Sequence, residues 1–254
     1  CGHGSFFASK TANDMVGRLT SILTLTPYAY WQRAHALHHA SSANLDRRGI
    51  GDIDTLTVSE YRALPFAKRL GYRIYRNPLF MTFVGGVLHF LVIQRVPFSI
   101  QRPSWKMTSS VLSLNAAILV VYGALGTLIG WTEFVLLFAP IVVISSAAGV
   151  WLFYIQHQFE ETSWRREEDW NIQDASLHGS SHYALPGILR WITGNIGVHH
   201  VHHLASRIPF YRLGDVVMDH DVLAQTRRIT LWESFRCARL HLWDEKSRRL
   251  LSFA

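Results

Sequence analysis

The histidines of this sequence are the residues whose spacing could support chemistry. Residues 35–39 read His-Ala-Leu-His-His and residues 199–203 read His-His-Val-His-His, so both contain the pattern H-x-x-H-H. On a helix, positions i, i+3 and i+4 share one face, so each cluster is predicted to present three imidazoles to one place. These faces consist of His35, His38 and His39, and of His199, His202 and His203. His200 lies off the second face and is predicted not to act with the other three histidines.

Imidazoles gathered in this number favour a metal site. Protonated histidines repel one another, whereas neutral histidines bind metal ions. Imidazole suits zinc, copper, iron and nickel, and more than four histidines imply at least two ions. No serine, cysteine or carboxylate pair near the clusters is arranged for hydrolysis. The predicted function of such a metal site is therefore oxygen chemistry on a lipid by two irons. For any single histidine, the alternative is a structural role in which the ring is hydrogen-bonded.

Two apolar stretches must position these histidines. Val111–Trp131 and Phe134–Tyr154 are each about long enough to cross a bilayer core, and they predict a transmembrane hairpin with a very short turn. No Lys or Arg occurs from Met107 to Trp164, so the basic flanks, and the histidines with them, are expected on the cytoplasmic face. Two helices buried in a large soluble core are the alternative. The run Leu79–Ile93 is shorter and is predicted to be re-entrant or interfacial.

The remaining segments predict short helices and loops. Apolar residues between Ala12 and Leu23 follow helical spacing, which predicts an amphipathic helix on the membrane surface. Residues 40–55 are expected to form a polar loop. Thr57 and Glu60 predict a capping box that opens a basic helix running toward Arg76. The predicted fold is an all-α integral membrane protein, with a transmembrane helical hairpin, interfacial amphipathic helices and a cytoplasmic histidine-rich cap.

The composition excludes several classes of protein. The chain has 254 residues, a formal net charge of +7, 17% charged and 49% hydrophobic residues, which argues against a disordered chain or a nucleic-acid partner. Its two cysteines, Cys1 and Cys237, exclude a disulfide scaffold, a thiolate zinc module and a self-contained iron–sulfur cluster. The first residue is not Met, and we expect a fragment of a longer chain.

The histidine clusters and their neighbours resemble the membrane fatty acid desaturase family, most closely its bacterial acyl-lipid delta-12 (omega-6) branch. That branch has three histidine boxes in order, and Cys1–Phe6 matches the end of the first, which reads His-Asp-Cys-Gly-His-Gly-Ser-Phe. The second box matches Trp31–His39 and the third matches Gly194–Leu204. Further similar strings are Asn44–Gly49, Gly51–Ile53, Gln156–Glu160 and Ile208–Pro209.

The resemblance implies a set of metal ligands. The boxes supply His3, His35, His38, His39, His199, His202 and His203, and His157 corresponds to an additional ligand at the end of the second span. Asn195 is a candidate for orienting a ligand or a water. The other histidines are taken as structural or surface residues: His89, His178, His182, His220 and His241. Residues 1–254 would then be a single desaturase domain that lacks the N-terminal spans and the first histidine of box one, and such a fragment is not expected to be active.

The resemblance also implies a reaction. A diiron centre would use O₂ to introduce a cis double bond into a fatty acyl chain of a membrane lipid. The chain shows no haem-binding extension and no flavin or nicotinamide fingerprint, so electrons would come from an external ferredoxin or cytochrome b5. A basic cytoplasmic face suits an acidic carrier, although topology and lipid headgroups explain the same charges. The expected location is the bacterial inner membrane, with the boxes on the cytoplasmic face.

Two other functions stay open at this point. A related diiron hydroxylase or ketolase, acting on alkanes, sterols or carotenoids, would use the same boxes. Phe210 and Ser163 depart from the residues expected there, which leaves fine specificity open. A histidine-rich metal transporter would need polar residues along its spans. Residues 111–154 offer only Asn115, a few serines and threonines, and Glu133 at the turn, which disfavours transport.

Overall fold

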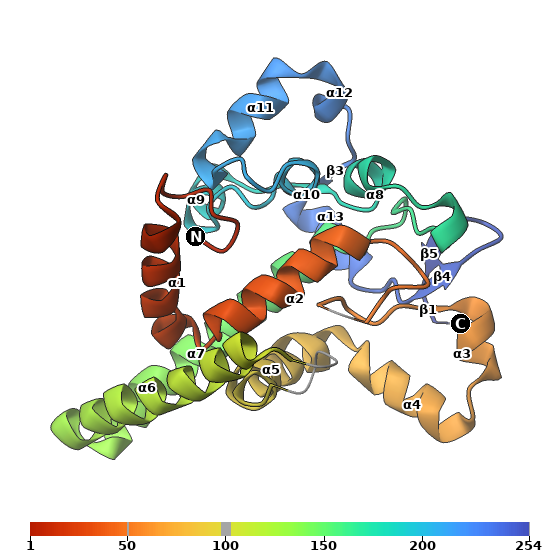
Figure 1. The fold of residues 1–254 in the computed structure, drawn as a ribbon. Coiled ribbons are helices and arrows are strands. Elements are labelled where there is room, and N and C mark those ends of the chain that lie inside the picture. The colour runs from red at the N-terminus through yellow and green to blue at the C-terminus, as the bar shows by residue number, and fades with distance from the viewer. Residues whose placement is uncertain (50, 98–102, 254) are drawn as a thin grey trace. The chain divides into compact units, whose positions relative to one another are not determined.

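The computed structural model describes residues 1–49, 51–97 and 103–253, and most of them are helical (Figure 1). The chain divides into two compact units. Unit 1 comprises Cys1–Ala36 and Leu79–Trp151, and unit 2 comprises Leu37–Pro78 and Leu152–Ala254. Two helices, α2 (Tyr28–Ser41) and α7 (Trp131–His157), run from unit 1 into unit 2.

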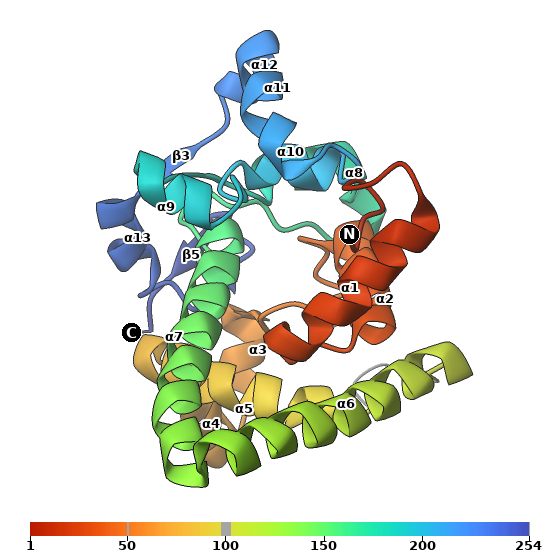
Figure 2. The same cartoon turned by 90° about the vertical axis from the view of Figure 1, so that its left-hand side faces the viewer.

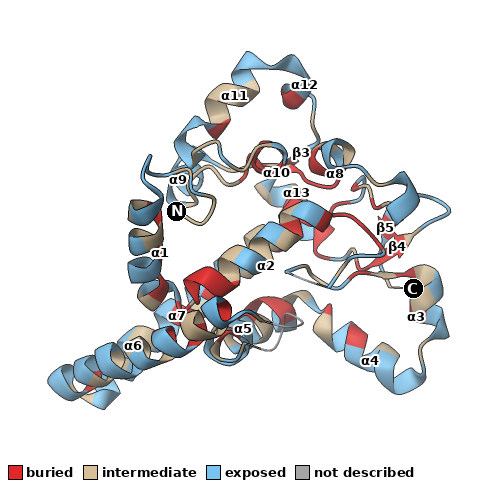
Figure 3. Cartoon of the chain, in the orientation of Figure 1, coloured by how far each residue is buried: buried red, intermediate tan, exposed pale blue. Residues whose placement is uncertain are grey.

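Unit 1 contains the two long apolar helices, α6 (Trp105–Ile129) and α7. Both are long and apolar enough to cross a membrane, which confirms the two predicted apolar helices, and each is longer than predicted. A third span exists only if Phe66–Tyr75 and Phe80–Arg95 are counted as one broken helix. Most of α6 is exposed, as expected for a helix whose natural surroundings are lipid (Figure 3).

The turn between α6 and α7 is a single glycine. Gly130 has φ +95°, a left-handed conformation that a glycine adopts without strain. Beside it, Tyr122 packs on Phe138 with ring centroids 4.6 Å apart, and a Cβ on Gly126 would stand 2.6 Å from the Trp131 ring. Figure 2 shows the two helices meeting at this turn and running apart from it, so they are consecutive helices and do not form the closely packed hairpin that the sequence predicts.

Shorter helices complete unit 1. α1 (Lys10–Thr24) matches the predicted amphipathic helix, and its apolar residues Met15, Leu19 and Leu23 are exposed. The buried residues of α1 lie on the opposite face and are Asn13, Gly17 and Ser21. Asn13 Oδ1 accepts the backbone N–H of Phe7 at 3.1 Å. The run Leu79–Ile93 forms a π-helical segment (Phe80–Gly85), α5 (Gly86–Leu91) and the start of a 3₁₀ turn (Ile93–Arg95).

Unit 2 contains five short strands in two small sheets, so the expectation of an all-α fold was wrong in this respect. β1 (Leu56–Thr57) pairs in parallel with β4 (Leu242–Asp244), which pairs antiparallel with β5 (Arg249–Leu251). β2 (His182–Ala184) pairs in parallel with β3 (Arg228–Thr230). These strands satisfy the backbone groups of extended connections, and at two or three residues each they are too short to show an alternating sequence pattern.

The helices of unit 2 are short. The predicted capping box is confirmed at α3 (Val58–Ala63), where Thr57 Oγ1 accepts from the N–H of Glu60 at 3.2 Å. The single basic helix predicted from there toward Arg76 was wrong, since Pro65 separates α3 from α4 (Phe66–Tyr75). The remaining helices are α8 (Ile172–His178), α9 (Gly187–Ile192), α10 (His199–Leu204), α11 (Leu213–Asp219), α12 (Asp221–Ala224) and α13 (Leu231–Cys237).

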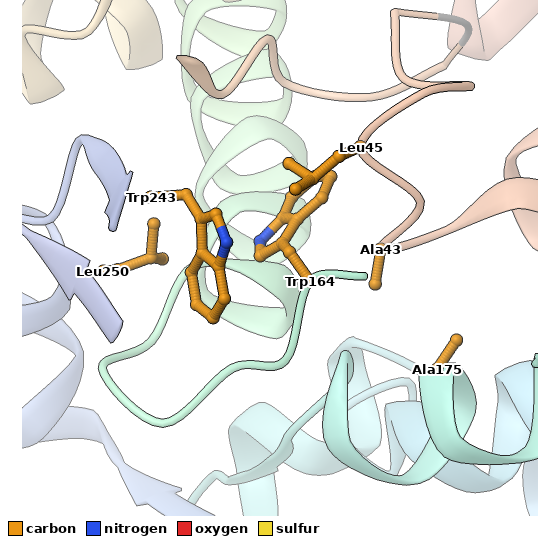
Figure 4. Close-up of a cluster of buried hydrophobic side chains, with 6 residues drawn as sticks. All are labelled: Ala43, Leu45, Trp164, Ala175, Trp243 and Leu250. Atoms are coloured by element: carbon orange, nitrogen blue, oxygen red, sulfur yellow. The ribbon is translucent and has the colours of Figure 1, made fainter. Parts of the chain in front are cut away.

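One apolar cluster packs the loop after α2 against the segment after α7. The rings of Trp164 and Trp243 face each other, with Leu45 on one side and Leu250 on the other (Figure 4). Beside them, the Leu45 N–H donates to the Arg165 carbonyl at 2.9 Å. The loop that follows Ser41 is irregular as predicted, although its residue 50 lies outside the described residues. This cluster holds together the ends of the two helices that carry His38 and His157.

Candidate metal centre

Four histidines of unit 2 bring their ring nitrogens together in the interior. They come from three helices: His38 from α2, His157 from the end of α7, and His199 and His203 from α10. His157 Nε2 lies 3.2 Å from His38 Nε2 and 3.0 Å from His199 Nε2, and His203 Nε2 lies 3.1 Å from His199 Nε2. All four side chains are buried, and α10 is buried over most of its length (Figure 3). We call this group the four-histidine cluster.

The local sequence explains how α10 supplies two of these residues. His199 and His203 are four positions apart, so they lie one turn apart on the same face of the helix. His200 points elsewhere, and its Nε2 donates to the Leu223 carbonyl at 3.0 Å. Among the described residues it is not one of the four grouped nitrogens, and its lack of a ligand role stays a prediction.

Two of the rings are fixed through their second nitrogen. His38 Nδ1 contacts a carboxylate oxygen of Asp52, and His157 Nδ1 donates to the Gly179 carbonyl at 3.2 Å. A metal-binding histidine is commonly held by a carboxylate or a carbonyl in this way, which sets its tautomer and orients the ring. The Nδ1 proton is then engaged in both rings, and each Nε2 carries a lone pair.

The arrangement fits a metal ion. The Nε2 lone pairs of His38 and His157 face each other across 3.2 Å, which is unfavourable unless a cation lies between them. Two nitrogens at right angles around one ion, each about 2.1 Å from it, would lie about 3.0 Å apart, close to the observed separations. The nitrogen atoms of the cluster all lie within 4.8 Å of one another. His38, His157, His199 and His203 are therefore suited to hold one ion.

Burial keeps the two rings on α10 neutral. For His199 and His203, burial and then the neighbouring imidazoles of the cluster hold the pKa well below its usual range. A neutral imidazole is the form that binds a metal, so the site has its lone pairs available without prior loss of a proton.

The other histidines of the two clusters lie beside this group or in unit 1. In unit 2, the His39 ring lies 4.8 Å from that of His202 and 4.2 Å from that of His203. The expectation that each H-x-x-H-H motif points its three imidazoles at one place was wrong. His38 joins the four-histidine cluster, whereas His39, which is about 100° further round the helix, has its ring beside that of His202.

In unit 1, the His3 and His35 rings lie 4.9 Å apart. Trp31 stacks on His35 at 4.5 Å, and a Cβ on Gly2 would stand 2.3 Å from the Trp31 ring. The glycine of the first box therefore allows the chain to pass close enough to bring His3 beside His35.

Asn195 lies in the turn before α10 with φ +57°. Its backbone carbonyl accepts the N–H of Val198 at 3.0 Å, which helps to shape the start of the helix. No hydrogen bond joins its side chain to a histidine among the described residues, and its role in orienting a ligand stays a prediction.

Two supporting residues were not identified from the sequence. Asp52 was noted only as part of a family-like string, and its contact with His38 depends on the fold of the loop after α2. Arg76 is completely buried and makes no contact with a carboxylate among the described residues. Its guanidinium instead donates to the Asp54 carbonyl at 2.8 Å, to Gln158 Oε1 at 2.9 Å and to the Leu240 carbonyl at 3.0 Å.

Arg76 therefore connects three segments behind the four-histidine cluster. Gln158 directly follows His157, and Thr55, whose hydroxyl accepts from Arg76 at 3.0 Å, lies three residues after Asp52. The guanidinium has five donors in a fixed plane, so one side chain can satisfy acceptors from several directions. No short sequence pattern identifies such a residue, since its partners come from distant parts of the chain.

Comparison with known proteins agrees with this site. The family model described as fatty acid desaturase matches residues 1–234. A fatty acid desaturase from Bacillus subtilis (strain 168) is 43% identical over 253 residues, which is 100% of this chain and 71% of that protein.

Two cyanobacterial relatives are more distant. An sn-1 acyl-lipid omega-3 desaturase (ferredoxin) from Nostoc sp. (strain 36) is 30% identical over 84% of this chain and 59% of its own length. An sn-1 oleoyl-lipid 12-desaturase from Synechocystis sp. (strain ATCC 27184 / PCC 6803 / Kazusa) is 26% identical over 84% of this chain and 60% of its own length. The chain therefore belongs to the fatty acid desaturase family of lipid-metabolising enzymes.

Proposed function

We propose that the protein containing this chain introduces a cis double bond into a fatty acyl chain of a membrane lipid, using O₂. The observation that carries the proposal is the four-histidine cluster, in which buried ring nitrogens from three helices converge and two of the rings are already oriented. Desaturation balances as the loss of two hydrogens from adjacent methylenes, with O₂, two electrons and two further protons giving two molecules of water.

The metal we propose is a pair of iron ions. His38, His157, His199 and His203 would hold one of them, and the remaining ligands would be His3, His35, His39 and His202. Iron is compatible with imidazole ligands, and eight histidines exceed what one ion can use. Bound iron would supply the reduction of O₂ and the removal of hydrogen from an unactivated carbon. The protein's part is to bury the ligands, to orient the rings of His38 and His157 through Asp52 and the Gly179 carbonyl, and to exclude water.

The proposed substrate is an acyl lipid in the bilayer, with the new bond at the delta-12 (omega-6) position. α6 and α7 have the length and apolar surface to lie in lipid. Two relatives are named for action on acyl lipids, one at the omega-3 position and one as a 12-desaturase, so the bond position rests on likeness alone. We place the protein in the bacterial inner membrane with the histidine boxes on the cytoplasmic face, because Lys and Arg flank the apolar helices.

The proposed electron donor is a ferredoxin or a cytochrome b5. The Nostoc relative carries ferredoxin in its name. This chain is basic overall, with a formal charge of +7, and a basic face attracts an acidic carrier protein.

The test is production of a new fatty acid in cells. The full-length gene would be expressed in a host rich in oleoyl and palmitoleoyl lipids, and total fatty acids would be analysed by gas chromatography–mass spectrometry. We expect a diunsaturated acid from the wild type and none from His38→Ala. His220→Ala removes an exposed histidine and is the matched control, which is expected to retain the product.

Each other outcome has a definite meaning. A hydroxylated or ketone product that also disappears in His38→Ala would replace desaturation by a related oxygenation. Iron-loaded membrane protein without any new lipid product would contradict the proposed substrate. A wild-type protein that contains no iron would contradict the metal assignment.

A further inference from the structure

A second polar site lies in unit 2, between strand β2 and the turn that leads into α10. It is a hollow of about 60 Å³, several times the roughly 10–15 Å³ that a single water needs. His182 and Arg228 line it from the paired strands β2 and β3, Arg190 lines it from α9, and Thr193 and Asn195 line it from the following turn. We call it the cationic hollow.

The two arginines of the cationic hollow have no counter-charge. Neither Arg190 nor Arg228 forms an ion pair within the part of the chain that the structure describes, and no carboxylate lines the hollow. The neighbouring Arg227 differs, because it pairs with Glu161 at 3.4 Å and with Glu233 at 3.1 Å. Two adjacent arginines therefore have opposite electrostatic surroundings, and only one of them is available to an anion.

The pKa of the histidine in the hollow is also affected by this excess of positive charge. Burial first, and then the nearby charges of His200, Arg228 and Arg190, together lower the pKa of His182 to about 4. An anion bound between the arginines would relieve this repulsion. Arginine suits phosphate in particular, since its planar group donates two parallel hydrogen bonds to two phosphate oxygens.

The helices that follow the two strands of the hollow expose large apolar side chains. β2 and β3 are parallel, and α9 and α13 follow their carboxyl ends within a few residues. On α9, Trp191 is 82% exposed beside Ile188 and Ile192. On α13, Trp232 is 78% exposed and Phe235 is exposed with it. Tryptophan favours the level of lipid headgroups, where its ring contacts both apolar and polar surroundings.

We propose that the cationic hollow binds the phosphate of a membrane phospholipid, with Arg190 and Arg228 holding the phosphate oxygens. The exposed tryptophans and isoleucines favour a lipid over a free anion, because they give the acyl region an apolar surface next to the charges. The inference concerns lipid binding and stands whether or not the metal centre performs desaturation.

Equilibrium binding tests the proposal. The purified full-length protein, in an uncharged detergent, would be titrated by calorimetry with short-chain phosphatidylglycerol, with short-chain diacylglycerol and with inorganic phosphate. We expect phosphatidylglycerol to bind, and the dissociation constant to rise about tenfold or more in Arg190→Gln/Arg228→Gln, because each charge-assisted hydrogen bond contributes on this scale. Arg227→Gln loses the same charge one residue away and is expected to stay within about twofold of the wild type.

The remaining outcomes would overturn the proposal. An unchanged dissociation constant in the double variant would show that the arginines do not hold the phosphate. An equal loss in Arg227→Gln would reduce the effect to overall charge, and inorganic phosphate bound as tightly as phosphatidylglycerol would exclude a lipid site. If the double variant melts at a lower temperature, Arg190→Gln alone provides the same comparison, since this side chain is exposed.

Discussion

The four-histidine cluster and the cationic hollow lie in the same unit, and both use the segment between Gly179 and His203, yet their electrostatics are opposite. In the cluster, burial lowers the pKa of His199 and His203 and leaves neutral rings whose lone pairs attract a cation. In the hollow, the guanidinium groups are exposed and keep their charge, which attracts an anion. Exposure to water thus decides which sign of ligand each group of basic side chains can bind.

The largest expected effect comes from removing one nitrogen of the cluster. His203→Ala should abolish metal binding and product formation, a larger effect than the roughly 10–100-fold loss caused by removing a hydrogen-bond partner of a ligand. Iron per chain, measured by mass spectrometry, and fatty acid analysis check this. His200→Gln is the control, because it keeps a donor for the Leu223 carbonyl and is not part of the cluster. Full iron content in His203→Ala would show that the cluster does not hold the ion.

Arg76 differs from the basic residues of both sites, because its guanidinium group is charged and also buried. Arg76→Met should destabilise the protein by several kcal/mol, because each buried acceptor left unpaired costs about 1–3 kcal/mol. A fall in the thermal unfolding midpoint in detergent would measure the effect. Arg73→Met changes an exposed arginine three residues away and should have a small effect. Equal midpoints for the two variants would show that the hydrogen bonds of Arg76 add no net stability.

A smaller effect is expected at the carboxylate that orients His38. Asp52→Asn should weaken iron binding about 10–100-fold without abolishing it, because the amide no longer carries the charge that strengthens the ligand. Competition with a chelator measures the affinity. Asp54→Asn, an exposed carboxylate in the same loop, is the matched control. If both variants release iron at the same chelator concentration, the Asp52 contact does not support the ligand.

The smallest effect concerns His182 in the cationic hollow. Its pKa is lowered to about 4 mainly by burial, whereas an unfolded histidine titrates near about 6.5. The unfolded state therefore binds more protons between these values, and this contribution to stability is complete above about pH 6.5 and is lost as the pH falls toward about 4.

The unfolding midpoint measured against pH should accordingly fall less steeply in His182→Gln than in the wild type over this range. Arg228→Gln removes a positive charge beside His182, so it should raise the pKa of His182 and reduce the acid sensitivity in the same direction. Identical pH profiles for the wild type and both variants would contradict the burial of a neutral His182.

Much of the fold could be predicted because the signals are local. The apolar stretches identified α6 and α7, helical spacing identified α1, and Thr57 with Glu60 identified the start of α3. Helical periodicity also separated His200 from His199 and His203. The strands were missed because two or three residues carry no periodic signal, and the break at Pro65 was missed although proline is a local cue.

The sequence by itself determined three features: histidines at helical spacing, apolar helices of membrane length, and the family to which such a pattern belongs. Those features depend on neighbouring positions, which the backbone geometry of a helix relates directly. Only the tertiary structure decided that His38 lies with His157 while His39 lies with His202, and that Asp52 and Arg76 support the site. It also decided that Arg227 is neutralised while Arg228 forms no ion pair with any described residue, because burial and charge pairing are set by residues that are distant in the chain.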